Sequence, residues 1–343
     1  MAIKKAASSF VGYLIALAIA FTPTVYAQER YLIPVGSTVG IEMKTDGVMV
    51  AGLSTPTGCT ASPAGESGIS AGDFIIKFGN LQINSAVELI SAIRGFEGGE
   101  VSLTFRRGDL IKQATVKPAL SPEGFNQLGL LLRDSVSGIG TVTFIDPETG
   151  MYGALGHAIT DVDNGLIMPL SRGEILDSSV VDVRKGSPGT PGELCGSFDS
   201  RNKRGNIVIN TEKGIFGFVD DNDSMRSLSD PMPIAGDIRP GAATILSNVR
   251  GKEIGEYSVE ITRVYRNDEK GRSLMLTVTD PKLLEITGDI VQGMSGSPII
   301  QDGKLIGAVT HVLINDPTRG YGVSIENMLA FTQGDIMRNA ARQ

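Results

Sequence analysis

The stretch Gly-Met-Ser-Gly-Ser-Pro-Ile-Ile, residues 293–300, contains the best candidate nucleophile of this 343-residue chain. Ser295 lies between glycines just before an apolar strand, so few side-chain atoms crowd the backbone N–H groups of this turn. The N–H groups of Gly293 and Ser295 can therefore converge on a developing negative charge, and Pro298 stiffens the end of the turn. The stretch predicts a nucleophilic serine with an oxyanion hole. By itself it is equally compatible with an ordinary Gly/Ser/Pro loop between strands.

A nucleophilic serine needs a base, and the chain has only two histidines. His157 lies between Gly156 and Ala158, and these small neighbours leave room for a nucleophile and a substrate. His311 lies in an apolar run that is typical of a strand. We therefore predict His157 as the base and interpret His311 as a strand residue.

A carboxylate that orients the base completes such a site. Asp280 closes an alternating strand pattern and precedes Ser295 by fifteen positions. The order His157, Asp280, Ser295 is the chymotrypsin order, and the Gly-x-Ser-x-Gly elbow of α/β-hydrolases is absent because residue 297 is serine. Other candidates by sequence proximity are Asp161, Asp163 and Asp289.

Four motifs occur together in this chain. They are Gly-His-Ala (156–158), Gly-Thr-Pro-Gly-Glu-Leu (189–194), Thr-Asp (279–280) and Gly-Met-Ser-Gly-Ser-Pro (293–298). Their combination resembles the stage IV sporulation protein B family, serine peptidases of endospore-forming bacteria. The resemblance extends to a PDZ domain ahead of the peptidase and covers nearly the whole chain after the N-terminal segment.

The resemblance implies a mainly β protein in which a PDZ domain precedes a trypsin-like double β-barrel with a C-terminal helix. It places the catalytic residues at His157, Asp280 and Ser295. It also implies export from the forespore into the space between its two membranes, with self-cleavage near the N-terminal segment releasing the protein from the membrane. There the protein would act on a regulator of a membrane-embedded metalloprotease complex and so activate a late mother-cell sigma factor.

Composition limits the other functions. The net charge of −7 argues against nucleic-acid binding, which requires a basic face. Cys59 and Cys195 do not form a metal-ligand spacing, and we interpret them as free, or as a disulfide in an oxidising compartment. The acidic run at residues 220–223 lacks the later glutamate and turn glycine of a calcium loop. We therefore expect no metal and no cofactor.

Four segments are expected along the chain. Residues 1–27 have two lysines, a short apolar run and a small residue at Ala27, which is typical of a signal peptide or an uncleaved anchor. Residues 31–119 are predicted to form the PDZ domain, 120–129 a linker, and 130–343 the peptidase domain. Short strands separated by Gly, Pro, Asp and Asn turns favour a barrel or sandwich, and residues 324–338 a final helix.

In the PDZ segment, Val39, Gly40 and Ile41 resemble the loop that holds a peptide's C-terminal carboxylate on backbone N–H groups. A helix is predicted at residues 85–94, and strands at 101–106 and 111–116. A structural β-domain without a ligand is the plainer alternative for this segment.

Two other functions remain open from the sequence. One is a non-catalytic PDZ scaffold that binds a membrane partner, which a serine-reactive probe distinguishes from a peptidase. The other is a quality-control protease that joins a trypsin-like barrel to PDZ domains, although in such proteins the PDZ domain follows the peptidase. Expected partners are protein or peptide substrates, membrane-embedded regulators of a sporulation protease, and a peptide ligand of the PDZ domain.

Overall fold

A computed structural model describes residues 29–187, 189–265, 272–313 and 316–330. The described residues from Tyr31 onward form one compact unit, and strands dominate it. The export signal expected at residues 1–27 lies outside the described residues. Among the helices in the described ranges, none has the length and apolar character needed to cross a bilayer.

A first ring of six strands closes because β2 pairs with both β11 and β9. Apolar side chains from these strands, including Val39, Val142 and Ile207, fill the interior of the ring. In ring order the strands are β9 (Leu130–Ile145), β10 (Met151–Ala154), β13 (Gly214–Val219), β12 (Glu193–Thr211), β11 (Leu170–Arg184) and β2 (Thr38–Leu53). The same sheet continues from β9 into β1 (Tyr31–Pro34) and β14 (Met232–Pro233).

A second ring is a closed barrel of six antiparallel strands in the C-terminal part of the chain. Its core contains Ile245, Leu276 and Ile299, each without exposed surface. In barrel order the strands are β15 (Gly241–Arg250), β16 (Glu253–Val264), β17 (Leu274–Val278), β20 (Asp316–Ser324), β19 (Lys304–Leu313) and β18 (Pro298–Gln301). Helix α4 (Pro281–Thr287) follows β17, and the 3-10 helix η1 (Ser224–Ser227) lies between β13 and β14.

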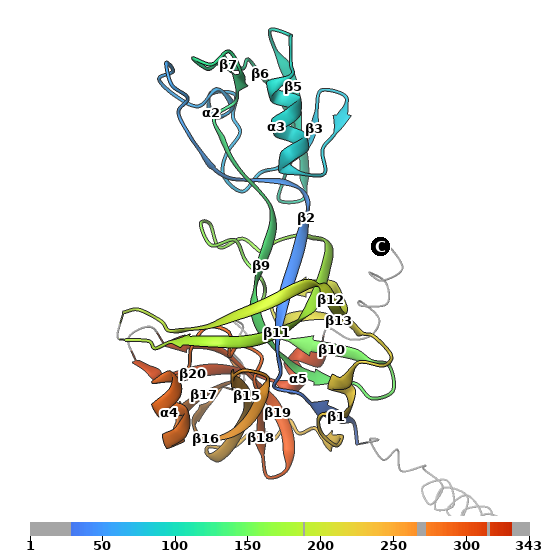
Figure 1. The fold of residues 1–343 in the computed structure, drawn as a ribbon, viewed down its shortest axis with the longest axis vertical. Coiled ribbons are helices and arrows are strands. Elements are labelled where there is room, and N and C mark those ends of the chain that lie inside the picture. The colour runs from blue at the N-terminus through green and yellow to red at the C-terminus, as the bar shows by residue number, and fades with distance from the viewer. Residues whose placement is uncertain (1–28, 188, 266–271, 314–315, 331–343) are drawn as a thin grey trace, which may run out of the picture. The chain divides into compact units, whose positions relative to one another are not determined.

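The PDZ segment has its own core, around Val50, Ile75 and Leu103. It begins on the second half of β2 and returns through the first residues of β9, and these two strands run side by side (Figure 1). Its other elements are α2 (Pro63–Glu66), β3 (Phe74–Phe78), β4 (Leu81–Gln82), α3 (Ala86–Arg94), β5 (Val101–Arg107) and β6 (Leu110–Val116). The helix predicted at 85–94 and the strands predicted at 101–106 and 111–116 are confirmed, with Ser85 accepting from the N–H of Glu88 as the N-cap.

Val39, Gly40 and Ile41 do not lie in an open loop, as the sequence pattern had suggested. They occupy the middle of β2 in the first ring, where Gly40 is aligned with Leu176 on one side and Ile139 on the other. Val39 and Ile41 are buried, and a Cβ added to Gly40 would lie 2.4 Å from the Phe198 ring. Since both edges of the strand are paired, this backbone is not available to a peptide carboxylate.

Three other segments differ in detail from the sequence expectations. Within residues 120–129, expected as a linker, β8 (Asn126–Gln127) pairs with β7 (Ala119–Leu120). Residues 165–169, in the region expected to consist of short strands, form only one isolated bridge, between Thr160 and Ile167. Of the helix expected at 324–338, α5 (Ile325–Leu329) is described, with Ser324 as its N-cap, and the rest lies outside the described residues.

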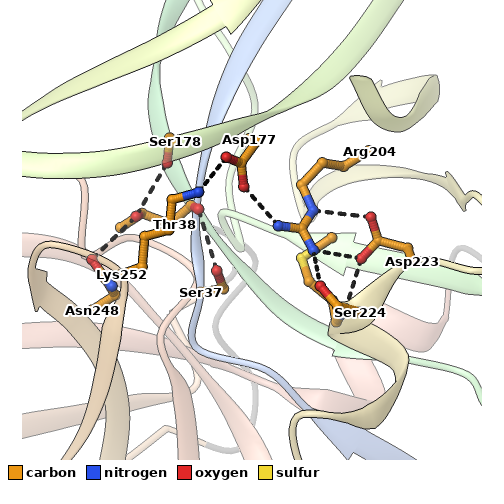
Figure 2. Close-up of polar contacts among 10 residues, drawn as sticks. Ser37, Thr38, Asp177, Ser178, Arg204, Asp223, Ser224, Asn248 and Lys252 are labelled. Carbon is orange, nitrogen blue, oxygen red and sulfur yellow. Dashed lines mark hydrogen bonds and ion pairs between the residues drawn. The ribbon is translucent and has the colours of Figure 1, made fainter. Parts of the chain in front are cut away.

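Polar contacts join the two rings (Figure 2). Asp177 on β11 accepts from Lys252, which lies in the turn between β15 and β16, and from Arg204 on β12. The guanidinium of Arg204 also contacts Asp223 through two hydrogen bonds, of 2.9 and 2.8 Å. Although burial acts to raise the pKa of Asp177, the two cations lower it, so the carboxylate is held charged between the rings.

Arg204→Met should destabilise the protein by about 3 kcal/mol, because it leaves the nearly buried Asp223 carboxylate without its cation. The free energy of unfolding in urea measures the effect. Arg201→Met is the matched control on the same strand, since the Arg201 side chain is 89% exposed and its partner Asp199 is only half-buried. The control should change stability by less than about 0.5 kcal/mol. Equal losses in the two variants would contradict the proposed role of Arg204.

Candidate active site

Ser295 lies in a turn whose shape depends on two glycines and on the first ring. Gly293 and Gly296 have φ angles of +97° and +99°, a region that favours glycine. A Cβ on Gly296 would lie 2.0 Å from the carbonyl oxygen of Thr141 on β9. The Thr141 N–H donates to the Ser295 carbonyl at 3.1 Å, and its hydroxyl donates to the Gly293 carbonyl at 2.7 Å. The turn is therefore fixed by a residue of the neighbouring ring.

The groups predicted for chemistry are available in this turn. Among the hydrogen bonds between described residues, none uses the N–H of Gly293 or of Ser295 as donor. The Ser295 hydroxyl donates to the carbonyl of Thr310 on β19, with an Oγ–O distance of 2.6 Å. One turn thus carries a hydroxyl and two N–H groups without an acceptor among the described residues, the groups that a serine nucleophile with an oxyanion hole uses.

His157 is presented by a strained turn at the end of β10. Leu155 has a φ of +68°, which is unfavourable for a leucine, and Gly156 follows with +71°. A Cβ on Gly156 would lie 2.8 Å from the side chain of Thr310, the residue whose carbonyl accepts from Ser295. The turn therefore brings His157 and Ser295 to the same part of β19.

The second histidine lies directly against the first. The His157 and His311 rings are 4.7 Å apart, measured between centroids, and are tilted by 38°. His311 follows Thr310 on β19, so it is a neighbour of the candidate site that the sequence interpretation treated as an ordinary strand residue. A signal was present, because β19 is the second strand after Ser295 and carries the only other histidine of the sequence.

The protonation of both rings follows from their surroundings. Burial lowers the pKa of His157 below its ordinary value of 6.5, and the nearby Ala158 carbonyl only partly opposes this shift. Since that carbonyl can only accept, Nδ1 at 2.8 Å from it carries the proton, and Nε2 is left as the acceptor. Burial, and then repulsion from His157 and Arg272, lower the pKa of His311 to about 4. Near pH 7 both imidazoles are neutral.

Asp280 has a different environment from the one predicted. It is the N-cap of α4, with Oδ1 accepting from the N–H groups of Lys282 and Leu283 and Oδ2 from that of Ser258. His311 of β19 lies opposite Tyr321 of β20, and Tyr321 lies opposite Met275 of β17. Met275 precedes Asp280 by five residues. At about 3.3 Å per residue this separates Asp280 from His311 by roughly 16 Å along the strand. The structure brings His157 and Ser295 to the neighbouring residues Thr310 and His311 of β19, but it does not bring Asp280 there.

The other aspartates also differ from one another in their surroundings. Asp161 is buried and pairs with Arg133, which also contacts Asp163. Asp289 is buried as well, and its Oδ1 atom has no hydrogen-bond partner among the described residues. The carbonyl of Ala158 is therefore the group that orients His157 in this structure.

The sequence matches the SpoIVB peptidase S55 family over residues 124–329, which is more than half of the chain. The chain belongs to this family. A match to a PDZ domain covers residues 38–117. The S55 chain is thus a serine peptidase with a PDZ domain ahead of its peptidase domain. The expected fold class, mainly β with barrels and a short C-terminal helix, is confirmed.

Solved structures similar to parts of this S55 peptidase include the PDZ domains of SdrC-like proteins from Listeria monocytogenes and Listeria innocua. They are 29% and 28% identical to it, cover 25% and 26% of this chain and 87% and 94% of their own, and each has a TM-score of 0.22. The active form of the Rv3671c protease from M. tuberculosis is 14% identical, covers 60% of this chain and 75% of its own, and has a TM-score of 0.32. No curated protein matches the chain significantly.

Neither cysteine forms a disulfide, and a metal-binding group is not found among the described residues. Cys59 and Cys195 are both free. Within the described ranges, no three His, Cys, Asp or Glu side chains cluster closely enough to hold a metal ion. The acidic run that ends at Asp223 supplies the N-cap of η1 and the partner of Arg204.

Replacing Asp280 separates a catalytic role from a capping role. Asparagine caps helices about as well as aspartate, whereas alanine loses about 1 kcal/mol. If Asp280 only caps α4, Asp280→Asn should keep the helix cap and kcat/KM and lose only the acceptor of the 3.3 Å hydrogen bond from the Ser258 N–H, whereas Asp280→Ala should lower the melting temperature further. If its charge acts in catalysis, Asp280→Asn should fold normally and lose most of its kcat/KM. Thermal unfolding and peptidase assays on the same samples distinguish the two outcomes.

The pH dependence of kcat/KM should report the lowered pKa of His157. The base must be neutral, so activity should rise with pH through an acidic limb that lies below 6.5. An uncharged peptide substrate keeps other ionisations out of the profile. His311→Gln should keep this limb, since the pKa of His311 is about 4. A limb at or above pH 6.5 would contradict the assignment of His157.

Proposed function

We propose that this S55 peptidase is an endopeptidase in which Ser295 attacks the scissile carbonyl and His157 accepts its proton. The observation that carries the proposal is the meeting of the Ser295 turn, Thr310 and the His157–His311 pair. In the first step the Ser295 hydroxyl turns from the Thr310 carbonyl toward Nε2 of His157. The N–H groups of Gly293 and Ser295 then stabilise the oxyanion.

The role of Asp280 is a separate part of the proposal. The family resemblance gives it the place of the orienting carboxylate, whereas in this structure it caps α4. To reach His157 it would have to leave the N–H groups of Lys282 and Leu283, which exposes the start of the helix. As long as Asp280 caps α4, the Ala158 carbonyl stabilises the His157 tautomer with its proton on Nδ1, which leaves Nε2 as the acceptor.

The biological context is also proposed from the family. We infer that the protein is exported from the forespore into the space between its membranes and is anchored there until it cuts itself. Its substrates are then itself and a regulator of a membrane-embedded protease complex that activates a late sigma factor. No cofactor takes part in this chemistry. The support is the S55 family match over residues 124–329 together with the apolar N-terminal run.

The PDZ domain offers a peptide-binding surface elsewhere than at Val39–Ile41. A pocket of about 440 Å³ is lined by Ile90, Ile93 and Arg94 of α3 and by Leu130 and Leu132 of β9. In this part of the described chain β9 pairs only with β2, so its other edge is open. A peptide that adds a strand to this edge would place its side chains in the pocket.

Ser295→Ala in the full-length chain tests the catalytic assignment. The wild type should react with a fluorophosphonate probe and yield a shortened form, and Ser295→Ala should do neither. Ser297→Ala is the control from the same turn, because its buried hydroxyl contacts Ser247 and has no part in the reaction. It should still be labelled. If the folded wild type and Ser295→Ala behave alike, the nucleophile is misassigned or the protein acts as a binding scaffold.

A further inference from the structure

Asn210 is a polar residue whose side-chain amide binds the backbone that follows His157. It lies near the end of β12 and is half-buried. Its Oδ1 atom accepts from the Ile159 N–H at 2.8 Å, and its Nδ2 atom donates to the carbonyls of Ile159 and Met168 at 2.8 and 3.0 Å. The oxygen faces an N–H group and the nitrogen faces two carbonyls, so the partners themselves fix the orientation of the amide.

The contact with the Ile159 N–H reaches the imidazole through one peptide group. That N–H belongs to the same peptide as the Ala158 carbonyl, which lies 2.8 Å from Nδ1 of His157. A trans peptide is planar, and its C=O and N–H groups point in opposite directions. Asn210 therefore holds this peptide from one side while His157 contacts it from the other. The two hydrogen bonds are in series, and such bonds strengthen one another.

The strand register places Asn210 beside the turn that carries His157. Asn210 lies opposite Ile215 of β13, and Ile215 lies opposite Ala154, the last residue of β10. The β12–β13 hairpin also packs directly on this turn, since a Cβ on Gly214 would lie 2.5 Å from the Ala154 carbonyl oxygen. The amide thus comes from a paired strand of the first ring, whereas the peptide that it holds lies in irregular backbone.

The loop from Ile159 to Met168 also has supports of its own. The Met168 N–H donates to the Ile159 carbonyl at 3.0 Å, so the two ends of the loop are joined directly. Within the loop, Asp161 pairs with Arg133 of β9. Removing the Asn210 amide should therefore leave the loop in place and release chiefly the peptide at its start.

The orientation of this peptide decides the tautomer of His157. In the observed orientation a carbonyl faces Nδ1, so Nδ1 carries the proton and Nε2 can accept one from Ser295. If the peptide turned over, its N–H would face Nδ1, and the imidazole proton would have to lie on Nε2. Such an imidazole cannot act as the base. Oδ1 of Asn210 opposes this rotation because it binds the N–H on the far side of the peptide.

We propose that Asn210 is a positioning residue, which holds the peptide between Ala158 and Ile159 so that His157 keeps its proton on Nδ1. The inference rests on the proposed function, because the tautomer matters for the reaction only if His157 is the base. In other serine peptidases an orienting carboxylate contacts the imidazole itself. Here the amide acts on it through one peptide group.

Nitrogen NMR of the full-length protein with isotope-labelled histidine measures the tautomer directly. The chain has only two histidines, so the signals that remain in His311→Gln belong to His157. At about pH 7 the wild type should show a protonated Nδ1 and an unprotonated Nε2 for His157. Asn210→Ala should shift the population toward the tautomer with its proton on Nε2. An unchanged His157 spectrum in folded Asn210→Ala would overturn the proposal.

Kinetics on a peptide substrate give a second readout. A general base contributes about 10²–10⁴-fold, so Asn210→Ala should lower kcat by about tenfold or more and change KM by less than about twofold. A loss confined to KM would contradict a positioning role. If the wild type is active and both proteins show the same tautomer, the inference fails and the proposed function stands. If the tautomer changes but the wild type does not react with fluorophosphonate, the hold on His157 is supported and the proposed nucleophile is rejected.

Asn206→Ala is the matched control from the same strand. The Oδ1 atom of Asn206 also accepts from a backbone N–H, that of Phe218, at 3.0 Å. The variant should lower the melting temperature about as much as Asn210→Ala does, because each loses contacts of one side-chain amide with the backbone. It should keep the wild-type tautomer and kcat. An equal change of tautomer in both variants would show a general loosening of β12 and would overturn the specific role of Asn210.

Asn210→Asp separates the acceptor from the two donors, and it supplies the test if Asn210→Ala does not fold. A carboxylate still accepts from the Ile159 N–H but has no N–H for the carbonyls of Ile159 and Met168. Because the acceptor is what opposes rotation of the peptide, this variant should keep the proton of His157 on Nδ1 even where its melting temperature falls. Folded Asn210→Asp with that proton on Nε2 would overturn the proposal.

Discussion

The contact between Thr141 and the Ser295 turn is the constraint on which the candidate active site depends. Thr141 belongs to β9 of the first ring, and it holds the carbonyls of Gly293 and Ser295 through its hydroxyl and its N–H. Only a glycine at 296 lets the two backbones approach so closely. Because the turn is also fixed by Thr141, the N–H groups of Gly293 and Ser295 can stay without a partner among the described residues, while those of Met294, Gly296 and Ser297 are paired. The proposed oxyanion donors thus depend on how the rings pack as much as on the Gly-Met-Ser-Gly sequence.

Strand β19 connects the Ser295 turn to His157, the candidate base. Its Thr310 carbonyl receives the Ser295 hydroxyl, and its next residue, His311, packs against His157. Two neutral imidazoles can share a poorly solvated place, whereas two charged ones would repel each other there. The pairing therefore favours the unprotonated state that a general base must have. Strand β19 therefore contacts both Ser295 and His157 and fixes the position of one candidate residue relative to the other.

The sequence predicted the parts of the fold and site that depend on local pattern and on rare residue types. Ser295 and His157 were predicted because glycines frame the first and histidines are scarce, and their catalytic roles stay predictions. Helix α3 was predicted correctly because its cap and apolar spacing are local. The prediction of a carboxylate-binding loop at Val39–Ile41 was wrong because a glycine between apolar residues has the same sequence pattern in a loop and in a long strand. Here the strand is β2, which belongs to both the first ring and the PDZ segment. Asp280 before a proline is also a helix start, so its hydrogen bonds go to α4. Thr141, Thr310 and His311 matter only through contacts across strands, which one sequence does not reveal.

The features that depart from ordinary protein structure gather around one turn. Leu155 has a left-handed backbone beside His157. Among the described residues, the N–H groups of Gly293 and Ser295 and the Oδ1 atom of the buried Asp289 have no hydrogen-bond partner. Such features are unfavourable for the folded chain and are typical of functional sites. In the proposed reaction, the oxyanion of the substrate would accept hydrogen bonds from the two N–H groups. The unpaired N–H groups therefore support the proposed position of a substrate carbonyl at the Ser295 turn.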